Sequence, residues 1–116
     1  EGSSIFQYNT AGLLIHVYTT KGQSLDLSYD GNERITRIVD NAKDAKRQVL
    51  TFAYNEQNKP SKITLVGQGE ITVTYDDQGE IASAESAQGS VMSLKVTKVF
   101  QNLLTAVKVA GVKFGM

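Results

Sequence analysis

The 116-residue chain has no cysteine, no tryptophan, one proline and one histidine. Without cysteine it has no disulfide framework, no thiolate metal site and no cysteine nucleophile. A single histidine is too few for a zinc site built from several imidazoles. The 12 basic and 12 acidic residues balance to zero net charge, which argues against a dedicated nucleic-acid-binding domain. The composition therefore predicts no metal, no cofactor and no nucleic-acid partner.

Long apolar segments are also absent. The chain has no run of roughly 18 apolar residues, the length that predicts a transmembrane helix. Chains of about 100–200 residues usually form one domain, and 41% of the residues here are hydrophobic. We therefore expect residues 1–116 to form a single domain with its own core.

Tyrosine marks an internal repeat. Four of the five tyrosines have an apolar residue two positions before them and asparagine or aspartate directly after them. These four are Tyr8, Tyr29, Tyr54 and Tyr75. They lie 21, 25 and 21 residues apart, and an extra polar stretch over 41–47 accounts for the longer step. The spacing indicates one structural unit repeated four times.

Each unit has the pattern of a β-hairpin. Apolar and polar residues alternate before the tyrosine, as at Leu25, Leu27 and Tyr29, which is typical of a half-buried strand. Asparagine, aspartate, glycine and glutamine are common in the next four positions and favour a turn. In the returning strand the apolar residues are three apart, as at Ile35 and Ile38, so we expect a β-bulge or strong twist there. The four units predict a mainly β fold, an antiparallel up-and-down meander of about eight short strands.

The spacing Tyr-Asp/Asn-x-x-Gly-x-Leu/Ile-x-x-Ile resembles the YD repeat, also called the Rhs repeat. Residues 75–81 keep the tyrosine, the aspartate, the glycine and the aliphatic residue at the expected places. Glu33 and Asn58 replace the glycine in the second and third units, and Pro60 replaces the aliphatic residue in the third. The resemblance covers residues 5–90.

The resemblance implies a β-repeat protein outside the cytoplasm. Members of this family are bacterial surface or secreted proteins, and related repeats occur in animal adhesion receptors. In large members the repeat sheet spirals into a hollow shell that can enclose a toxin domain, and four repeats are too few to close such a shell. The chain is similar to small bacterial secreted or lipid-anchored proteins, so we expect a periplasmic, outer-membrane-attached or secreted bacterial protein.

The pattern changes at Ser90. Ser90 or Ser93 can cap the start of a helix, and Gly111 marks its end. An alternative is a ninth strand before a shorter helix, because Met92, Leu94 and Val96 alternate with other residues. We expect the helix to cover the apolar face of a curled sheet. Its apolar residues, at helical spacing, are Val96, Val99, Phe100, Leu103, Leu104 and Val107.

The candidate binding residues are the repeat tyrosines Tyr8, Tyr29, Tyr54 and Tyr75, because a row of exposed aromatic rings can stack sugars. A structural role competes with this one, since tyrosines in one register make cross-strand contacts and the adjoining Asp or Asn caps turn backbone. His16 has no serine or cysteine motif nearby, and a general base needs a positioned partner. We predict no catalytic residue and no metal ligand.

We therefore expect a non-enzymatic envelope or extracellular module that binds a glycan or a protein partner, or serves as a scaffold. One alternative is a fragment of a larger Rhs-type shell or polymorphic-toxin protein, with open sheet edges at 5–8 and 80–90. Another is peripheral membrane contact, because residues 91–116 hold four lysines and no acid. Open edges also favour a dimer through an edge strand.

Overall fold

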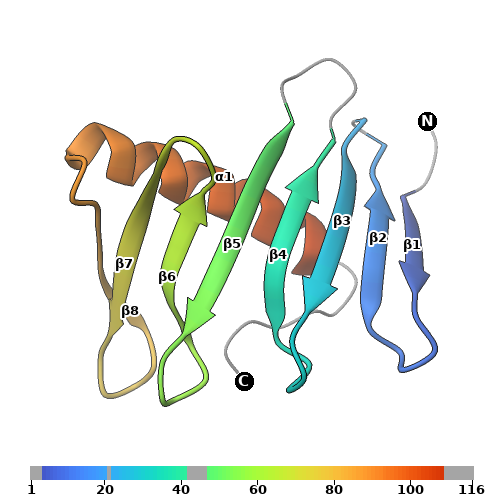
Figure 1. Ribbon diagram of the computed structural model, residues 1–116, viewed down its shortest axis with the longest axis horizontal. Coiled ribbons are helices and arrows are strands. Elements are labelled where there is room, and N and C mark those ends of the chain that lie inside the picture. The colour runs from blue at the N-terminus through green and yellow to red at the C-terminus, as the bar shows by residue number, and fades with distance from the viewer. Residues whose placement is uncertain (1–3, 21, 42–46, 109–116) are drawn as a thin grey trace.

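A computed structural model describes residues 4–20, 22–41 and 47–108. They form one eight-stranded antiparallel sheet whose strands lie side by side in sequence order, followed by one helix (Figure 1). The strands are β1 (Ile5–Tyr8), β2 (Leu14–Tyr18), β3 (Ser24–Tyr29), β4 (Ile35–Asp40), β5 (Gln48–Tyr54), β6 (Pro60–Leu65), β7 (Gly69–Tyr75) and β8 (Ile81–Glu85). The predicted meander is confirmed, and each predicted unit is one hairpin. We number these hairpins, β1–β2 to β7–β8, as repeats one to four.

The four hairpins share one turn and one bulge. Each repeat tyrosine is paired with the sixth residue after it. The residue just before the tyrosine is paired with the eighth residue after the tyrosine, so the seventh is skipped in the pairing of the two strands. In repeat two the skipped residue is Thr36, and this extra residue places Ile35 and Ile38 on the same face although they are three apart. The bulge predicted from that spacing is confirmed.

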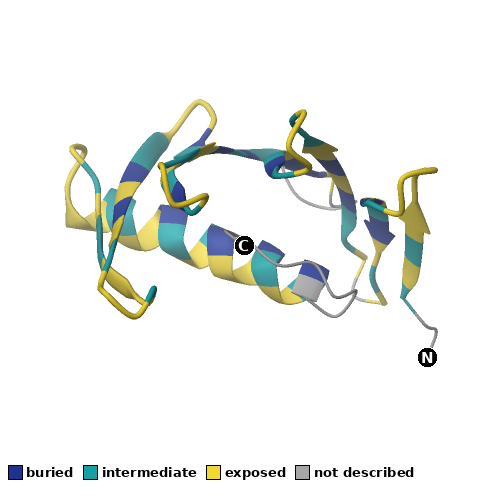
Figure 2. Cartoon of the chain, turned by 90° about the horizontal axis from the view of Figure 1, so that it is seen from below, coloured by how far each residue is buried: buried dark blue, intermediate teal, exposed yellow. Residues whose placement is uncertain are grey.

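Helix α1 (Ser90–Lys108) lies against the concave face of the curled sheet (Figure 2). Its contacts with strands are mainly to β6, β7 and β8. The Phe100 and Phe52 rings pack with their centroids 5.7 Å apart. Val99 and Leu104 are partly buried against the core. The fully or nearly buried helix residues are Val96, Phe100, Leu103 and Val107.

The alternative of a ninth strand is wrong, because Met92, Leu94 and Val96 are helical. β8 ends at Glu85, and Gly89, with φ of 104°, directly precedes the helix. Its carbonyl accepts a hydrogen bond of 3.0 Å from the Ser93 amide. The Met92 side chain then packs onto Gly69 at the start of β7, where a β-carbon would lie 2.5 Å from Met92 Cγ. Packing on the sheet therefore decides between helix and strand. The predicted stop at Gly111 lies outside the described residues.

Candidate functional site

The repeat tyrosines join each hairpin to the hairpin before it. The hydroxyl of Tyr29 donates to the Leu14 carbonyl at 2.7 Å. Tyr54 donates to Ile35 and Tyr75 donates to Pro60, both at 2.5 Å. The accepting residue is each time the sixth after the preceding tyrosine and is itself buried. We call this hydrogen bond the tyrosine link.

The strands that meet between repeats keep one register. The eighth residue after one tyrosine faces the third residue before the next tyrosine at every junction. The facing pairs are His16 with Asp26, Arg37 with Thr51 and Lys62 with Thr72. The longer connection between β4 and β5 leaves this relation unchanged, because its extra residues lie in the sequence between the paired Asp40 and Gln48. The tyrosine link and the register therefore belong to the repeat and not to one hairpin.

The residue after each tyrosine holds the hairpin turn. The Asp76 carboxylate accepts hydrogen bonds from the amides of Gln78 and Glu80, each at 2.9 Å. Asn9, Asp30 and Asn55 accept the equivalent pair of amides in the other three repeats. This confirms the predicted role of the Asp or Asn, and it explains why either residue serves, since only a side-chain oxygen acceptor is needed.

The fourth residue after the tyrosine has positive φ in every turn. Gly12 and Gly79 occupy it in repeats one and four, at φ of 85° and 81°. Glu33 and Asn58 adopt it at 63° each. Asparagine tolerates this left-handed region better than glutamate does. The two departures from the glycine of the repeat pattern therefore keep its backbone shape at a cost in strain, which is larger at Glu33.

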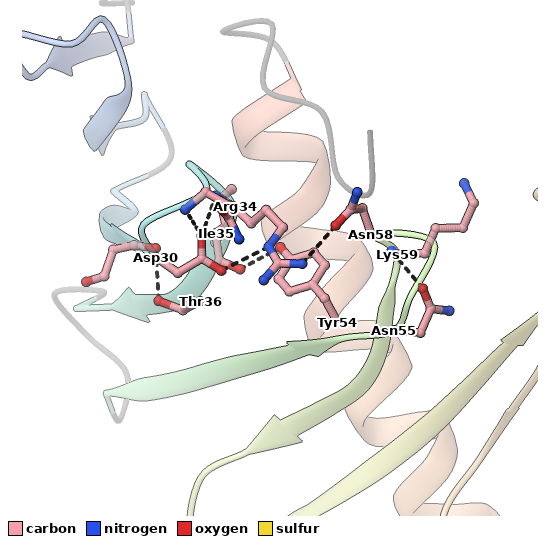
Figure 3. Close-up of polar contacts among 10 residues, drawn as sticks. Asp30, Arg34, Ile35, Thr36, Tyr54, Asn55, Asn58 and Lys59 are labelled. Carbon is pink, nitrogen blue, oxygen red and sulfur yellow. Dashed lines mark hydrogen bonds and ion pairs between the residues drawn. The ribbon is translucent and has the colours of Figure 1, made fainter.

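The side chain of Arg34 also connects the second repeat to the third (Figure 3). Arg34 Nε donates to Asp30 Oδ2 at 2.9 Å, and another Arg34 nitrogen donates to the Asn58 side-chain oxygen at 2.9 Å. The guanidinium carbon lies 4.7 Å from the Tyr54 ring centroid, within reach of a cation–π contact. Lys59, which holds the equivalent place one repeat on, has Nζ 5.5 Å from the Tyr75 ring centroid.

These contacts change the acidity of the groups involved. The hydrogen bond from the Arg34 amide is the main cause that lowers the pKa of Asp30, and the Arg34 guanidinium adds to it. Burial, with a smaller contribution from the nearby Asp30 carboxylate, raises the pKa of Tyr54 to about 12. Burial also raises the pKa values of Tyr29 and Tyr75. The linking hydroxyls therefore stay protonated, as donors, well above neutral pH.

Tyr8 differs from the other three repeat tyrosines. It lies on the edge strand β1, with no earlier repeat beside it among the described residues, and 49% of its surface is exposed. Ile5 on the same strand is 55% exposed. The expectation that the four tyrosines bind a glycan stays a prediction. The structure shows that three of the four hydroxyls already donate to backbone carbonyls within the chain.

His16 has partners that sequence spacing did not reveal. Its Nδ1 pairs with Asp26 Oδ1, and its Nε2 lies 3.3 Å from Ser24 Oγ. The second Asp26 oxygen accepts from Asn41 at 3.0 Å. Strand pairing between β2 and β3 brings these residues together, which is why no local motif showed them. The His16 side chain is 15% exposed and that of Asp26 is 52% exposed, so the cluster is open to water at the carboxylate, unlike the preorganised, water-excluding sites that stabilise transition states.

The basic helix has a buried apolar face and a small exposed one. The residues predicted to form its apolar face all pack toward the sheet, so they are not available to enter a membrane. Val91 and Leu94 are exposed at 83% and 58%, next to the exposed Lys95 and Lys98. Among the described residues, no helix combines the length and the apolar character needed to cross a bilayer.

The family model described as Teneurin YD-shell matches this chain over residues 1–67 and 23–111. Teneurin-3 of Danio rerio is 36% identical over 93 residues. Teneurin-4 of Homo sapiens is 37% identical and teneurin-4 of Mus musculus 36% identical over the same length. The matches cover 76% of this chain and 3% of each relative.

These relatives confirm the YD-repeat resemblance and correct its finer detail. The expected kinship with small bacterial secreted or lipid-anchored proteins is wrong, because the relatives found are animal teneurins. The repeat pattern on which the resemblance rested describes a hairpin turn and its flanking strands, and it does not distinguish the two groups. The match is to a structural repeat module and not to a catalytic family. The chain belongs to the Teneurin YD-shell family.

Proposed function

We propose that this module is one segment of a larger YD-repeat shell, joined to an earlier repeat through the open edge of β1. The observation that carries the proposal is the tyrosine link. Three repeat tyrosines donate to the preceding hairpin, and the fourth, Tyr8, has the same sequence surroundings but stands at the edge of the sheet. The small share of each relative that the chain covers, 3%, supports the same assignment.

The repeat geometry specifies how an earlier hairpin would dock. In the docking hairpin, the sixth residue after its own repeat tyrosine would present a carbonyl to the Tyr8 hydroxyl. The eighth residue after that tyrosine would face Ile5. Docking would cover Ile5 and Tyr8, which are about half exposed. It would also pair the free edge of β1, which as an exposed strand edge favours association with another strand.

The opposite edge of the sheet is arranged differently. Ala84 on β8 is the ninth residue after its tyrosine, and the equivalent residues Val17, Ile38 and Ile63 each face a strand of the next repeat. For Ala84 the carbonyl instead accepts a hydrogen bond of 2.8 Å from the Ser93 hydroxyl in the first turns of α1. We assign to α1 the role of closing the sheet beside β8 as well as covering its concave face.

Other expectations about function stay as proposals. An extracytoplasmic location fits a shell module, and a dimer through β1 is the state expected when no earlier repeat occupies that edge. Peripheral membrane contact has less support than the sequence suggested, because the driving force for such contact is buried apolar area and the main apolar face of α1 packs on the sheet.

A fusion tests the shell proposal. A copy of residues 47–68 is placed directly before Gly2, which keeps the 21-residue spacing between its Tyr54 and Tyr8 that separates Tyr54 and Tyr75 in the chain. We expect the added hairpin to raise the unfolding midpoint of the whole protein. We also expect Tyr8→Phe to destabilise the fusion by about 1–3 kcal/mol, the cost of a buried acceptor left without its donor.

The same Tyr8→Phe change in the 116-residue chain is the matched control, and it should leave the free energy of unfolding almost unchanged. Urea unfolding of the four proteins gives the difference directly. Equal effects of Tyr8→Phe in the fused and unfused proteins would show that β1 does not form a tyrosine link, and the proposal would fail.

A further inference from the structure

A cavity of about 430 Å³ lies between the second half of α1 and the strands of repeat one. Its described walls come from three places: β1 and the residue before it, the turn between β2 and β3, and one face of α1. The lining residues are Ser4, Phe6, Thr19, Thr20, Gln23, Asn102, Thr105 and Ala106. This volume falls within the range of about 300–1,000 Å³ typical of small-ligand pockets.

The walls of this cavity are polar where the repeat pattern calls for an apolar residue. Ser4 is the fourth residue before its tyrosine, and the equivalent residues are Leu25, Leu50 and Ile71. Those three are 0%, 0% and 1% exposed in the core. Repeat one therefore replaces a core aliphatic side chain with a hydroxyl, and the space that the aliphatic chain would fill belongs to the cavity. A polar cavity holds water in the free protein, whereas an apolar packing defect stays dry.

The chemistry of the lining is uniform. The lining holds three threonines and a serine, which carry hydroxyls, and Gln23 and Asn102, which carry carboxamides. The Thr19 hydroxyl already accepts from the Gln23 amide at 3.0 Å, and the Thr105 hydroxyl donates to the Gln101 carbonyl at 2.9 Å. None of the described lining residues carries a charge. Phe6 adds one half-buried aromatic ring. A charged ligand would find no counter-charge among the described lining residues, and a wholly apolar ligand would not match their hydroxyl and carboxamide groups.

We propose that this cavity is a binding site for a neutral saccharide, such as the terminal sugar of a glycan. A sugar ring offers hydroxyls to the serine, threonine and amide groups, and its C–H face packs against an aromatic ring. The site lies on the concave side of the sheet, beside α1, and none of the four repeat tyrosines is among its described lining residues. The described lining residues all belong to this chain, so the site does not require an earlier repeat on β1.

The test uses amide chemical shifts of the nitrogen-15-labelled 116-residue chain. The probes are methyl α-D-glucopyranoside, methyl β-D-galactopyranoside and N-acetylglucosamine as neutral sugars, N-acetylneuraminic acid as an anionic sugar, and the acetylated amide of trialanine as a peptide. We expect at least one neutral sugar to shift the amides of Thr20, Gln23 and Asn102 in a saturable way. The anionic sugar and the peptide should shift them little.

Ser4→Leu is the decisive variant, because it restores the residue type that the other repeats have at this position. It should leave the thermal midpoint unchanged or higher and weaken sugar binding at least about tenfold, the effect of losing one or two neutral hydrogen bonds. Asn102→Ala should weaken binding about two- to tenfold. Ser28→Leu, the same substitution on the convex face of β3, is the matched control and should not change binding.

Several results would overturn the assignment. One is the absence of saturable shifts at the cavity with all three neutral sugars. Another is binding of the anionic sugar or the peptide as tight as that of any neutral sugar. A third is unchanged sugar affinity in a folded Ser4→Leu protein, which would place the binding elsewhere.

Discussion

Replacing Tyr54 by phenylalanine tests the tyrosine link with the smallest possible change. The substitution removes one hydroxyl, the donor to the Ile35 carbonyl. Ile35 is 2% exposed, so water cannot readily take the place of the lost donor. The ring itself keeps its packing and its contact with Arg34.

The expected loss of stability is about 1–3 kcal/mol, the cost of leaving a buried acceptor unpaired. For a domain of this size it corresponds to a fall in Tm of about 4 °C for each kcal/mol. Urea unfolding followed by circular dichroism measures the loss, and an unchanged slope shows that the denatured state is not altered. Tyr29→Phe should cost a similar amount, and the two effects should add because the links lie in different junctions.

Tyr8→Phe in the same chain is the control, since Tyr8 is an edge residue with 49% of its surface exposed. It should change the free energy of unfolding by less than about 0.5 kcal/mol, as surface substitutions usually do. The reasoning would be refuted if Tyr54→Phe and Tyr8→Phe destabilised the chain equally.

Three further predictions concern the turns and the pH profile. The free energy of unfolding should fall as pH rises from about 10, the usual pKa of tyrosine, to about 12, the pKa of Tyr54 in the folded chain. The reason is that Tyr54 loses its hydroxyl proton at lower pH in the unfolded chain than in the folded one. Urea unfolding at several pH values should show a smaller fall in the Tyr54→Phe variant. Glu33→Gly should raise the urea midpoint by relieving a residue at φ of 63°, a gain of about 1 kcal/mol. Asp76→Ala should lower the free energy of unfolding by about 1 kcal/mol, because the amides of Gln78 and Glu80 lose their acceptor. Asp76→Asn keeps a side-chain oxygen acceptor and should have a urea midpoint close to that of the unchanged chain.

Much of the fold could be predicted from local patterns. Alternation before each tyrosine specified the strands, and the three-residue spacing of Ile35 and Ile38 specified the bulge, because side-chain direction in a strand has a period of two. The helical spacing from Val96 onward located the amphipathic face that packs on the sheet. These features depend on neighbouring residues along the chain, which a single sequence displays directly.

The features that escaped prediction depend on contacts across strands or between layers. The tyrosine hydroxyl reaches a carbonyl 15 or 19 residues earlier, and no local rule names a backbone acceptor. One signal was present: the accepting residue is always the sixth after a tyrosine. His16 and Asp26 are ten residues apart and meet only through the register of β2 and β3. The choice of helix over strand at Met92 depended on its packing against Gly69.

A crystal structure of the fusion with the added residues 47–68 tests the account most directly. The account predicts that the Tyr8 hydroxyl donates to the carbonyl of the added Pro60 and that the added Lys62 faces Ile5, as Lys62 faces Thr72 in the chain itself. An added hairpin that pairs with β1 in another register, or that does not pair with it, would contradict the claim that one tyrosine link and one register build this sheet.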